Sequence, residues 1–187
     1  MAFVGLSRPY VAKLTDESTK QYTNCFKCGK AISLSVTPNY NEVKLYADNV
    51  LDEYVKEFKD GTISLGTDRL PSVAQTVMFG HTVTTAAGGD TITYKSNDNS
   101  DYVGIGFVVD EVLDGVKTYT ATIIYKCKFA EAADSYTTKG DSIEFKTPTV
   151  EGAIAALSDY TWKTVKTFSS AEGAEAFIQT TLGYTSI

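Results

Sequence analysis

The sequence predicts a mainly β fold with two short helices. In residues 119–129 the odd positions are apolar and the even positions, apart from Ile124, are polar. This alternation is typical of a strand with one buried and one solvent-exposed face. Turn dipeptides between apolar runs are the second observation: Asp60-Gly61, Gly88-Gly89 and Asp114-Gly115. Together these features predict about nine strands, several of them paired as hairpins.

Residues 1–30 are predicted to form an extended N-terminal arm. They contain Pro9 and several polar turns, and only residues 10–14 suggest a short strand. The next strand spans residues 32–36, where apolar residues alternate with serines, and it is expected to end at Pro38.

Residues 40–46 are predicted as a further strand, followed by a hairpin over residues 54–65. Asp60-Gly61 predicts a two-residue type I′ turn, because both central positions of that turn need positive φ. Such a turn would pair Phe58 directly with Ile63.

A short helix is predicted over residues 70–80. Pro71 lies near its first turn, where a missing N–H costs nothing, and Gly80 marks its end. Val83 and Ile92 then flank a glycine-rich hairpin loop.

Residues 102–129 are predicted as two long strands joined at Asp114-Gly115. One face of the first strand is apolar and is expected to face the core: Val103, Ile105, Phe107 and Val109. Gly104 and Gly106 lie on its other face, where a neighbouring element can approach closely.

The C-terminal part is predicted to hold strands at residues 143–145, 150–157 and 160–168, and then a helix over residues 169–183. A capping box formed by Ser169 and Glu172 starts this helix, and Gly183 ends it. Its apolar stripe consists of Ala174, Phe177, Ile178 and Leu182.

The net charge of −6 argues against sequence-independent nucleic-acid binding, which needs a basic surface to release counterions. An acidic surface suits a conduit that repels phosphate. Three cysteines fit a reducing compartment. The sequence shows neither a signal segment nor an apolar run long enough to span a membrane, so synthesis and folding in a cytoplasm are expected.

Two motifs raise the question of catalysis. Cys25 and Cys28 form a CxxC pair, but a tetrahedral zinc site would need Cys127 and His81 as further ligands. A thioredoxin-type site is disfavoured because no helix pattern follows the pair. His81 is the only histidine and is expected at an exposed position after the helix.

The remaining ligand patterns are incomplete. Asn97, Asn99 and Asp101 have the spacing of a calcium loop, but Tyr102 replaces its glycine. The Gly104–Gly106 pair lies within a strand and lacks the third glycine of a dinucleotide site. The acidic positions after residue 47 are interpreted as a solvated strand face: Asp48, Asp52, Glu53 and Glu57. We therefore expect no catalytic residue, no cofactor and no metal.

Several short blocks, in order, resemble the major tail tube protein of long-tailed temperate phages of Gram-positive bacteria. They are residues 5–10, 45–49, 57–58, 61–65, 70–80 and 103–107, and then Tyr-Lys-Cys-Lys-Phe at 125–129, Thr-Lys-Gly-Asp-Ser-Ile-Glu-Phe at 138–145 and Thr-Pro-Thr-Val-Glu-Gly at 147–152. Together they cover residues 5–162. The pair Cys25 and Cys28 and the terminal helix are not part of the family pattern.

The resemblance implies a β-sandwich or partial-barrel subunit with a flanking helix, forming hexameric rings that stack into a tube. DNA would leave the phage head through the lumen without specific binding. The implied partners are further copies of the chain and the tape-measure, tail terminator and distal tail proteins, with no membrane contact. The protein would lie in the virion tail after assembly in the host cytoplasm.

Sheets that continue between subunits remove exposed strand edges, so strand residues are the candidates for this contact. The candidate positions for the inter-subunit sheet are Val43, Leu45, Tyr46, Tyr54, Phe58, Ile63, Leu65, Tyr119, Ile123 and Tyr125. Two alternatives stay open: another virion subunit, such as a head decoration or tail-completion protein, and a β-barrel module that binds a small ligand. The tube of a contractile tail also stays open.

Overall fold

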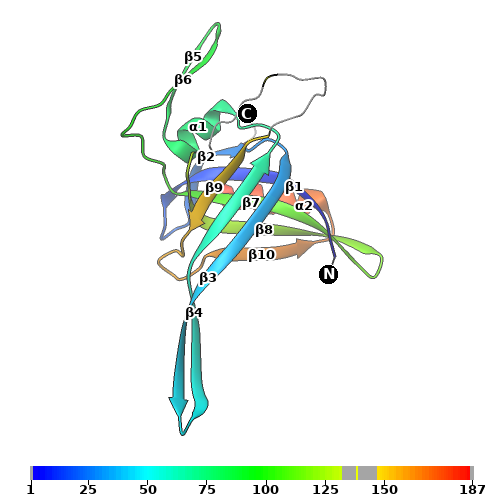
Figure 1. Ribbon diagram of the computed structural model, residues 1–187. Coiled ribbons are helices and arrows are strands. Elements are labelled where there is room, and N and C mark those ends of the chain that lie inside the picture. The colour runs from blue at the N-terminus through cyan, green and yellow to red at the C-terminus, as the bar shows by residue number, and fades with distance from the viewer. Residues whose placement is uncertain (1, 132–137, 139–146, 186–187) are drawn as a thin grey trace.

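The computed structural model describes residues 2–131, 138 and 147–185, and it has the mainly β fold predicted from the sequence (Figure 1). The strands are β1 (Ala2–Asp16), β2 (Gln21–Lys27), β3 (Ala31–Ala47), β4 (Val50–Thr67), β5 (Thr82–Ala86), β6 (Gly89–Thr93), β7 (Val103–Leu113), β8 (Val116–Phe129), β9 (Thr149–Ile154) and β10 (Lys163–Phe168). The helices are α1 (Ser72–Phe79) and α2 (Ala171–Leu182). The strand predicted at residues 143–145 lies outside the described residues.

Eight strands form one antiparallel sheet in the order β2-β1-β7-β8-β9-β4-β3, with β10 also paired to β8. The first half of β8, Tyr119 to Ile124, pairs with β10, whereas its end, Cys127 to Phe129, pairs with β9. Because β8 has two successive partners, the sheet separates there and β9-β4-β3 crosses in front of β7, β8 and β10 (Figure 1). The β5–β6 hairpin stands apart at one end of the molecule.

The two faces of the β7–β8 hairpin support two apolar clusters. The first packs β7 and β8 against β4, β9 and α1, and includes Ile63, Leu65, Met78, Ile105 and Ile124. The second packs the opposite face against α2, and includes Val108, Ala121, Ile123, Ile178 and Leu182. Burial on both faces makes this hairpin the centre of the fold.

The predicted turn at Asp114-Gly115 is confirmed, and both residues have positive φ, of 50° and 79°. The predicted wet face of β8 is wrong, since every side chain from Thr120 to Tyr125 is buried. The β4–β9 layer covers Ile124 on the face that alternation alone would leave in water, whereas α2 covers Ala121 and Ile123 on the face predicted as buried. A register shift in β8 also moves Cys127 and Phe129 into the first cluster, whereas Ile123 and Tyr125 lie in the second.

Gly104 and Gly106 lie beneath α2 as close-approach positions, as predicted. A Cβ atom on Gly106 would be 2.4 Å from Cγ2 of Ile178, and one on Gly104 would be 2.5 Å from the Tyr22 ring. These glycines therefore let α2 lie directly against the sheet. Ile178 and Leu182 fill the space that side chains would otherwise occupy.

The N-terminal segment differs from its prediction as an arm. Residues 2–27 form β1 and β2, and β1 lies inside the sheet between β2 and β7. Tyr10, Val11 and Ala12 are buried, so the short strand expected at residues 10–14 is the core of a longer one. Pro9 and the polar residues do not interrupt β1. The strand instead accommodates them by bending where its pairing with β7 shifts register.

The hairpin predicted at Asp60-Gly61 is wrong. β4 runs straight through both residues, and Gly61 pairs with Pro38 on one side and Ile154 on the other. The Asn39 side-chain amide donates to the Asp60 carboxylate at 2.6 Å, which accommodates both residues within the ladder. Pro38 does not end β3, because β3 lies at the end of the strand order and has no ladder partner to lose on its outer edge.

Both predicted helices are present. Gly80 and Gly183 end α1 and α2 in the left-handed conformation, with φ of 79° and 66°. The cap of α2 is Ser170 instead of the predicted Ser169: its hydroxyl accepts from the Gly173 N–H at 3.1 Å. The hairpin predicted around Val83 and Ile92 is also confirmed, and these two residues pair directly.

Candidate interaction surface

The outer part of the β3–β4 ladder projects far from the body of the molecule (Figure 1). The pairing of β9 with β4 ends at Gly61, so the ladder beyond that point extends past the sheet. All side chains of residues 40–57 are exposed. We call residues 40–57 the distal hairpin.

The turn of the distal hairpin is Asp48-Asn49. Both residues have positive φ, of 50° and 64°, which aspartate and asparagine tolerate better than other side chains. Two successive residues of this kind between paired strands form a type I′ turn, whose twist matches that of the strands. The local sequence therefore sets the register from Ala47–Val50 outward.

One face of the distal hairpin carries aromatic and charged side chains that contact one another. Lys56 bonds to Glu42 at 3.0 Å and lies 4.5 Å from the centre of the Tyr40 ring. Lys44 lies 5.5 Å from the centre of the Tyr54 ring. We call this side, which also carries Tyr46 and Leu51, the aromatic face. Its contacts stiffen the two-stranded ribbon.

The charged groups of the aromatic face shift each other's pKa values. Hydrogen bonds from Lys56 and from the Tyr54 hydroxyl lower the pKa of the Glu42 carboxyl. The same bond to Glu42 raises the pKa of Lys56. Both directions favour the ion pair at neutral pH.

The opposite face is aliphatic and lacks such a network. Side chains that are register partners share a face, which places five apolar residues together: Val43, Leu45, Ala47, Val50 and Val55. Glu53 and Glu57 border them, opposite Leu45 and Asn41. We call this side the aliphatic face. Contiguous exposed apolar groups rimmed by charge are typical of a protein interaction site.

The base of the distal hairpin is attached to the body by an aromatic stack. The rings of Phe58 and Trp162 are stacked with centroids 4.6 Å apart and an interplanar angle of 5°. Tyr40 contacts Phe58 edge-on at 6.3 Å. Because Trp162 directly precedes β10, this stack joins the base of the ribbon to the segment before that strand.

The structure divides the ten predicted inter-subunit positions into three groups. Those exposed on the distal hairpin are Val43, Leu45, Tyr46 and Tyr54. Half-buried positions are Phe58 at its base and Tyr119 on β8. Ile63, Leu65, Ile123 and Tyr125 belong to strands of the sheet, but their side chains are buried within this chain. Only the first group is free to present side chains to a partner.

Sequence reasoning missed four exposed apolar residues of the same hairpin: Tyr40, Val50, Leu51 and Val55. The available signal was Asp48-Asn49, a dipeptide suited to a type I′ turn. The turn was predicted at Asp60-Gly61 instead, and the acidic residues near Asp48 were interpreted as a solvated strand face. Exposure of the aliphatic side became evident only from the register.

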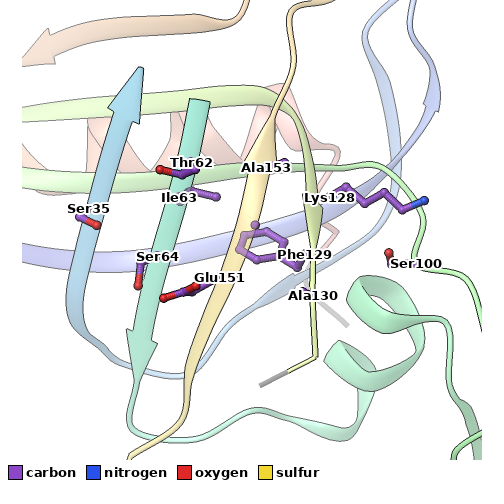
Figure 2. A pocket seen from close by; sticks show the side chains of 11 residues that line it. Ser35, Thr62, Ile63, Ser64, Ser100, Lys128, Phe129, Ala130, Glu151 and Ala153 are labelled. Carbon is purple, nitrogen blue, oxygen red and sulfur yellow. The ribbon is translucent and has the colours of Figure 1, made fainter. Parts of the chain in front are cut away.

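A second feature is an open groove of about 780 Å³ on the outer face of β3, β4 and β9. Figure 2 shows Glu151 beside Ser64 on the neighbouring strand, while Lys128 extends away from that carboxylate. The Lys128 ammonium donates instead to the Asn99 side chain at 2.9 Å. The groove is lined mostly by apolar surface, and three hydroxyl side chains lie on its strands: Ser35, Thr62 and Ser64.

His81 is buried, with 6% of its surface exposed, which contradicts its predicted exposed position. Its Nδ1 lies 2.8 Å from Asp98 Oδ2, and its Nε2 lies 3.8 Å from Glu131 Oε2. The bond to His81 lowers the pKa of Asp98. This histidine ties the loop after β6 to the end of α1, with Tyr94 packed on its ring at 4.3 Å.

The side chains of the calcium-loop pattern bond to other residues of the chain. Asn99 accepts from Lys128, and Asp101 is paired with Lys13. Within residues 2–131, 138 and 147–185, no three histidine, cysteine or acidic side chains are grouped as metal ligands.

The three cysteines are free thiols. Burial raises the pKa of both Cys25 and Cys28 to about 12, and burial also raises the pKa of Cys127. A thiol needs its thiolate form to act as a nucleophile, so the CxxC pair is poorly suited to redox chemistry at neutral pH.

Comparison with known protein families finds no matching family, and comparison with curated proteins finds no relative. Neither of the two helices in the described parts of the chain is long and apolar enough to cross a membrane.

Proposed function

We propose that this protein is a structural subunit of a phage tail, which polymerises as stacked hexameric rings into a tube through which DNA is ejected. The observation that carries the proposal is the distal hairpin. It extends eight large apolar side chains into solvent beyond the end of the sheet: Tyr40, Val43, Leu45, Tyr46, Val50, Leu51, Tyr54 and Val55.

A free two-stranded ribbon with an exposed apolar face is only marginally stable in an isolated chain and prone to association. Two-stranded hairpins are marginally stable in water, and their edges and apolar faces invite association. A defined partner that covers the ribbon removes both costs. Copies of the same chain supply such a partner in a homopolymer.

The charge of the chain supports the same role. Its net charge of −6 disfavours binding to phosphate, as a lumen that lets DNA pass requires. The blocks that resemble phage tail tube proteins, over residues 5–162, support it independently. In this role the protein has no catalytic step, and its neighbours are the tape-measure, tail terminator and distal tail proteins.

The test is assembly of the purified full-length chain. Light scattering with size-exclusion chromatography over a range of concentrations should show rings or longer species, and negative-stain electron microscopy should show tubes of constant width. Class averages viewed down the axis would give the ring number. A monomer at every concentration would contradict the proposal, whereas single rings that never stack would favour a decoration or tail-completion subunit.

The open groove supports a second candidate, a module that binds a small ligand. Its hydroxyl groups could donate hydrogen bonds to a polar molecule or accept them from it, and the Glu151 carboxylate could accept them. A chain that stays monomeric and whose melting temperature rises with a polar ligand from a small-molecule screen would favour this candidate.

A further inference from the structure

The two faces of the distal hairpin differ, and the difference identifies the docking side. On the aromatic face, Glu42 and Lys56 bond to each other, and both lysines lie over tyrosine rings. On the aliphatic face, Val43 and Val50 are both 66% exposed. Association buries apolar surface at little cost there, because no ion pair has to be broken.

The distal hairpin is also strongly acidic. Residues 40–57 contain five carboxylates and two lysines, a net charge of −3. Both lysines belong to the aromatic face, so Glu53 and Glu57 border the aliphatic face without a cation on that side. A partner should therefore offer apolar groups with basic ones beside them.

The opposite end of the same ladder has this character. There β3 begins at Ala31, paired with Thr67, and the segments 27–32 and 67–73 carry three cations and one carboxylate. Exposed apolar side chains lie among them, with Ile32 54% and Val73 40% exposed. We call this end the basic platform; its residues are Lys27, Lys30, Ile32, Arg69 and Val73.

The basic platform is held rigidly by backbone bonds. The Lys30 N–H donates to the Asp68 carboxylate at 2.6 Å, and the Asp68 N–H donates to the Lys30 carbonyl at 2.9 Å. Gly29, which precedes these bonds, has a φ of 63°. A Cβ atom at this position would be 2.6 Å from the Arg69 carbonyl oxygen. The Asp68 carboxylate is thus bonded to the backbone, whereas Lys27, Lys30 and Arg69 are exposed.

We propose that the aliphatic face of the distal hairpin in one copy docks on the basic platform of the next copy; this inference rests on the proposed self-assembly. The two surfaces lie at opposite ends of a 17-residue strand, about 55 Å apart at 3.3 Å per residue. Each copy offers one of each, so the contact is head-to-tail: it closes into a ring where the rotation between copies permits and otherwise extends as a filament.

The test compares two substitutions of equal exposure on opposite faces. Val43→Lys lies on the aliphatic face and Tyr46→Lys on the aromatic face, with wild-type exposures of 66% and 64%. Sedimentation velocity should show that Val43→Lys weakens assembly roughly tenfold, because a buried unpaired charge costs at least 1.4 kcal/mol. Tyr46→Lys should weaken assembly less than Val43→Lys does, because the aromatic face lies away from the proposed contact.

A charge exchange tests the partner surface. Glu53→Lys with Glu57→Lys should weaken assembly, as should Lys30→Glu with Arg69→Glu, and all four together should restore it. Equal effects of Val43→Lys and Tyr46→Lys, or no recovery in the fourfold variant, would overturn the docking assignment. In that case wild-type tubes would still support the proposed function, whereas a wild-type monomer would refute that function itself.

Discussion

The β7–β8 hairpin and the distal hairpin share a strand–turn–strand pattern but lie in opposite environments. Both have long alternating strands joined by a type I′ turn. In β7–β8, α2 and the β4–β9 layer cover the two faces, and Ile123 and Ile124 are fully buried. In the distal hairpin, Val43 and Lys44 are both exposed. The comparison shows that alternation predicts a strand, while its neighbours decide what it packs against.

The largest expected effect comes from a charge placed in the buried β7–β8 hairpin. Ile123→Asp should lose roughly 4–5 kcal/mol of folding free energy, because an unpaired carboxylate would replace a fully buried side chain. Soluble expression and thermal denaturation followed by circular dichroism would measure the loss. Val43→Asp is the matched control and should fold normally; a soluble, stable Ile123→Asp would contradict the packing of β8.

The close approach of α2 to β7 offers a smaller perturbation. Gly106→Ala puts a methyl group 2.4 Å from the branched Ile178 side chain, so the helix must shift. The expected loss is about 1–3 kcal/mol, the range for overpacked cores. Urea denaturation would measure it, with Gly88→Ala as control because nothing lies within 4 Å of that position. Equal midpoints for the two variants would show that α2 is not tightly seated.

The Phe58–Trp162 stack links the exposed hairpin to the body. Phe58→Ala should reduce folding free energy by about 2 kcal/mol, because the lost aromatic pair adds to the lost burial of a half-buried ring. Its greater effect should be faster hydrogen exchange in residues 40–57, with exchange in β7 and β8 unchanged. Uniformly faster exchange across the chain would mean that the ribbon and the body open together.

The smallest expected effect concerns the Glu42–Lys56 pair. The folded-state pKa of Glu42 is lowered from 4.5 by its hydrogen bonds to Lys56 and Tyr54. Its stabilising contribution is therefore present above the unfolded pKa and is lost as the pH falls through the lower folded value. Carbon-detected NMR titration should place the midpoint of Glu42 below 4.5 and show it rising in Lys56→Met. An unchanged midpoint in that variant would exclude the pair as the cause.

Much of the fold was predictable because local chemistry sets turns and caps. Asp114-Gly115, Gly80 and Gly183 were identified correctly, since a positive φ favours only a few residue types. The Asp60-Gly61 turn failed because the same dipeptide is accommodated in a ladder when Asn39 bonds to it and β9 pairs with Gly61. Ser169 failed as a cap by one position, within the usual uncertainty of helix ends.

Part of the candidate surface was also predictable. Val43, Leu45, Tyr46 and Tyr54 were selected as strand residues, and the structure shows them exposed. Ile63 and Ile123 were selected on the same grounds but are buried, because a period of two marks one face without saying whether another layer covers it. Val50 and Val55 were missed because their face depends on the turn at Asp48-Asn49.

By itself the sequence determined the mainly β class, the main turns, both helices and the acidic charge, since each depends on neighbouring residues or on composition. Tertiary structure alone decided that β1 joins the sheet, that α2 covers β8, and that the distal hairpin extends past β9 with its aliphatic face in water. These outcomes depend on contacts between residues far apart in the chain, and no local pattern encodes which distant element will supply them.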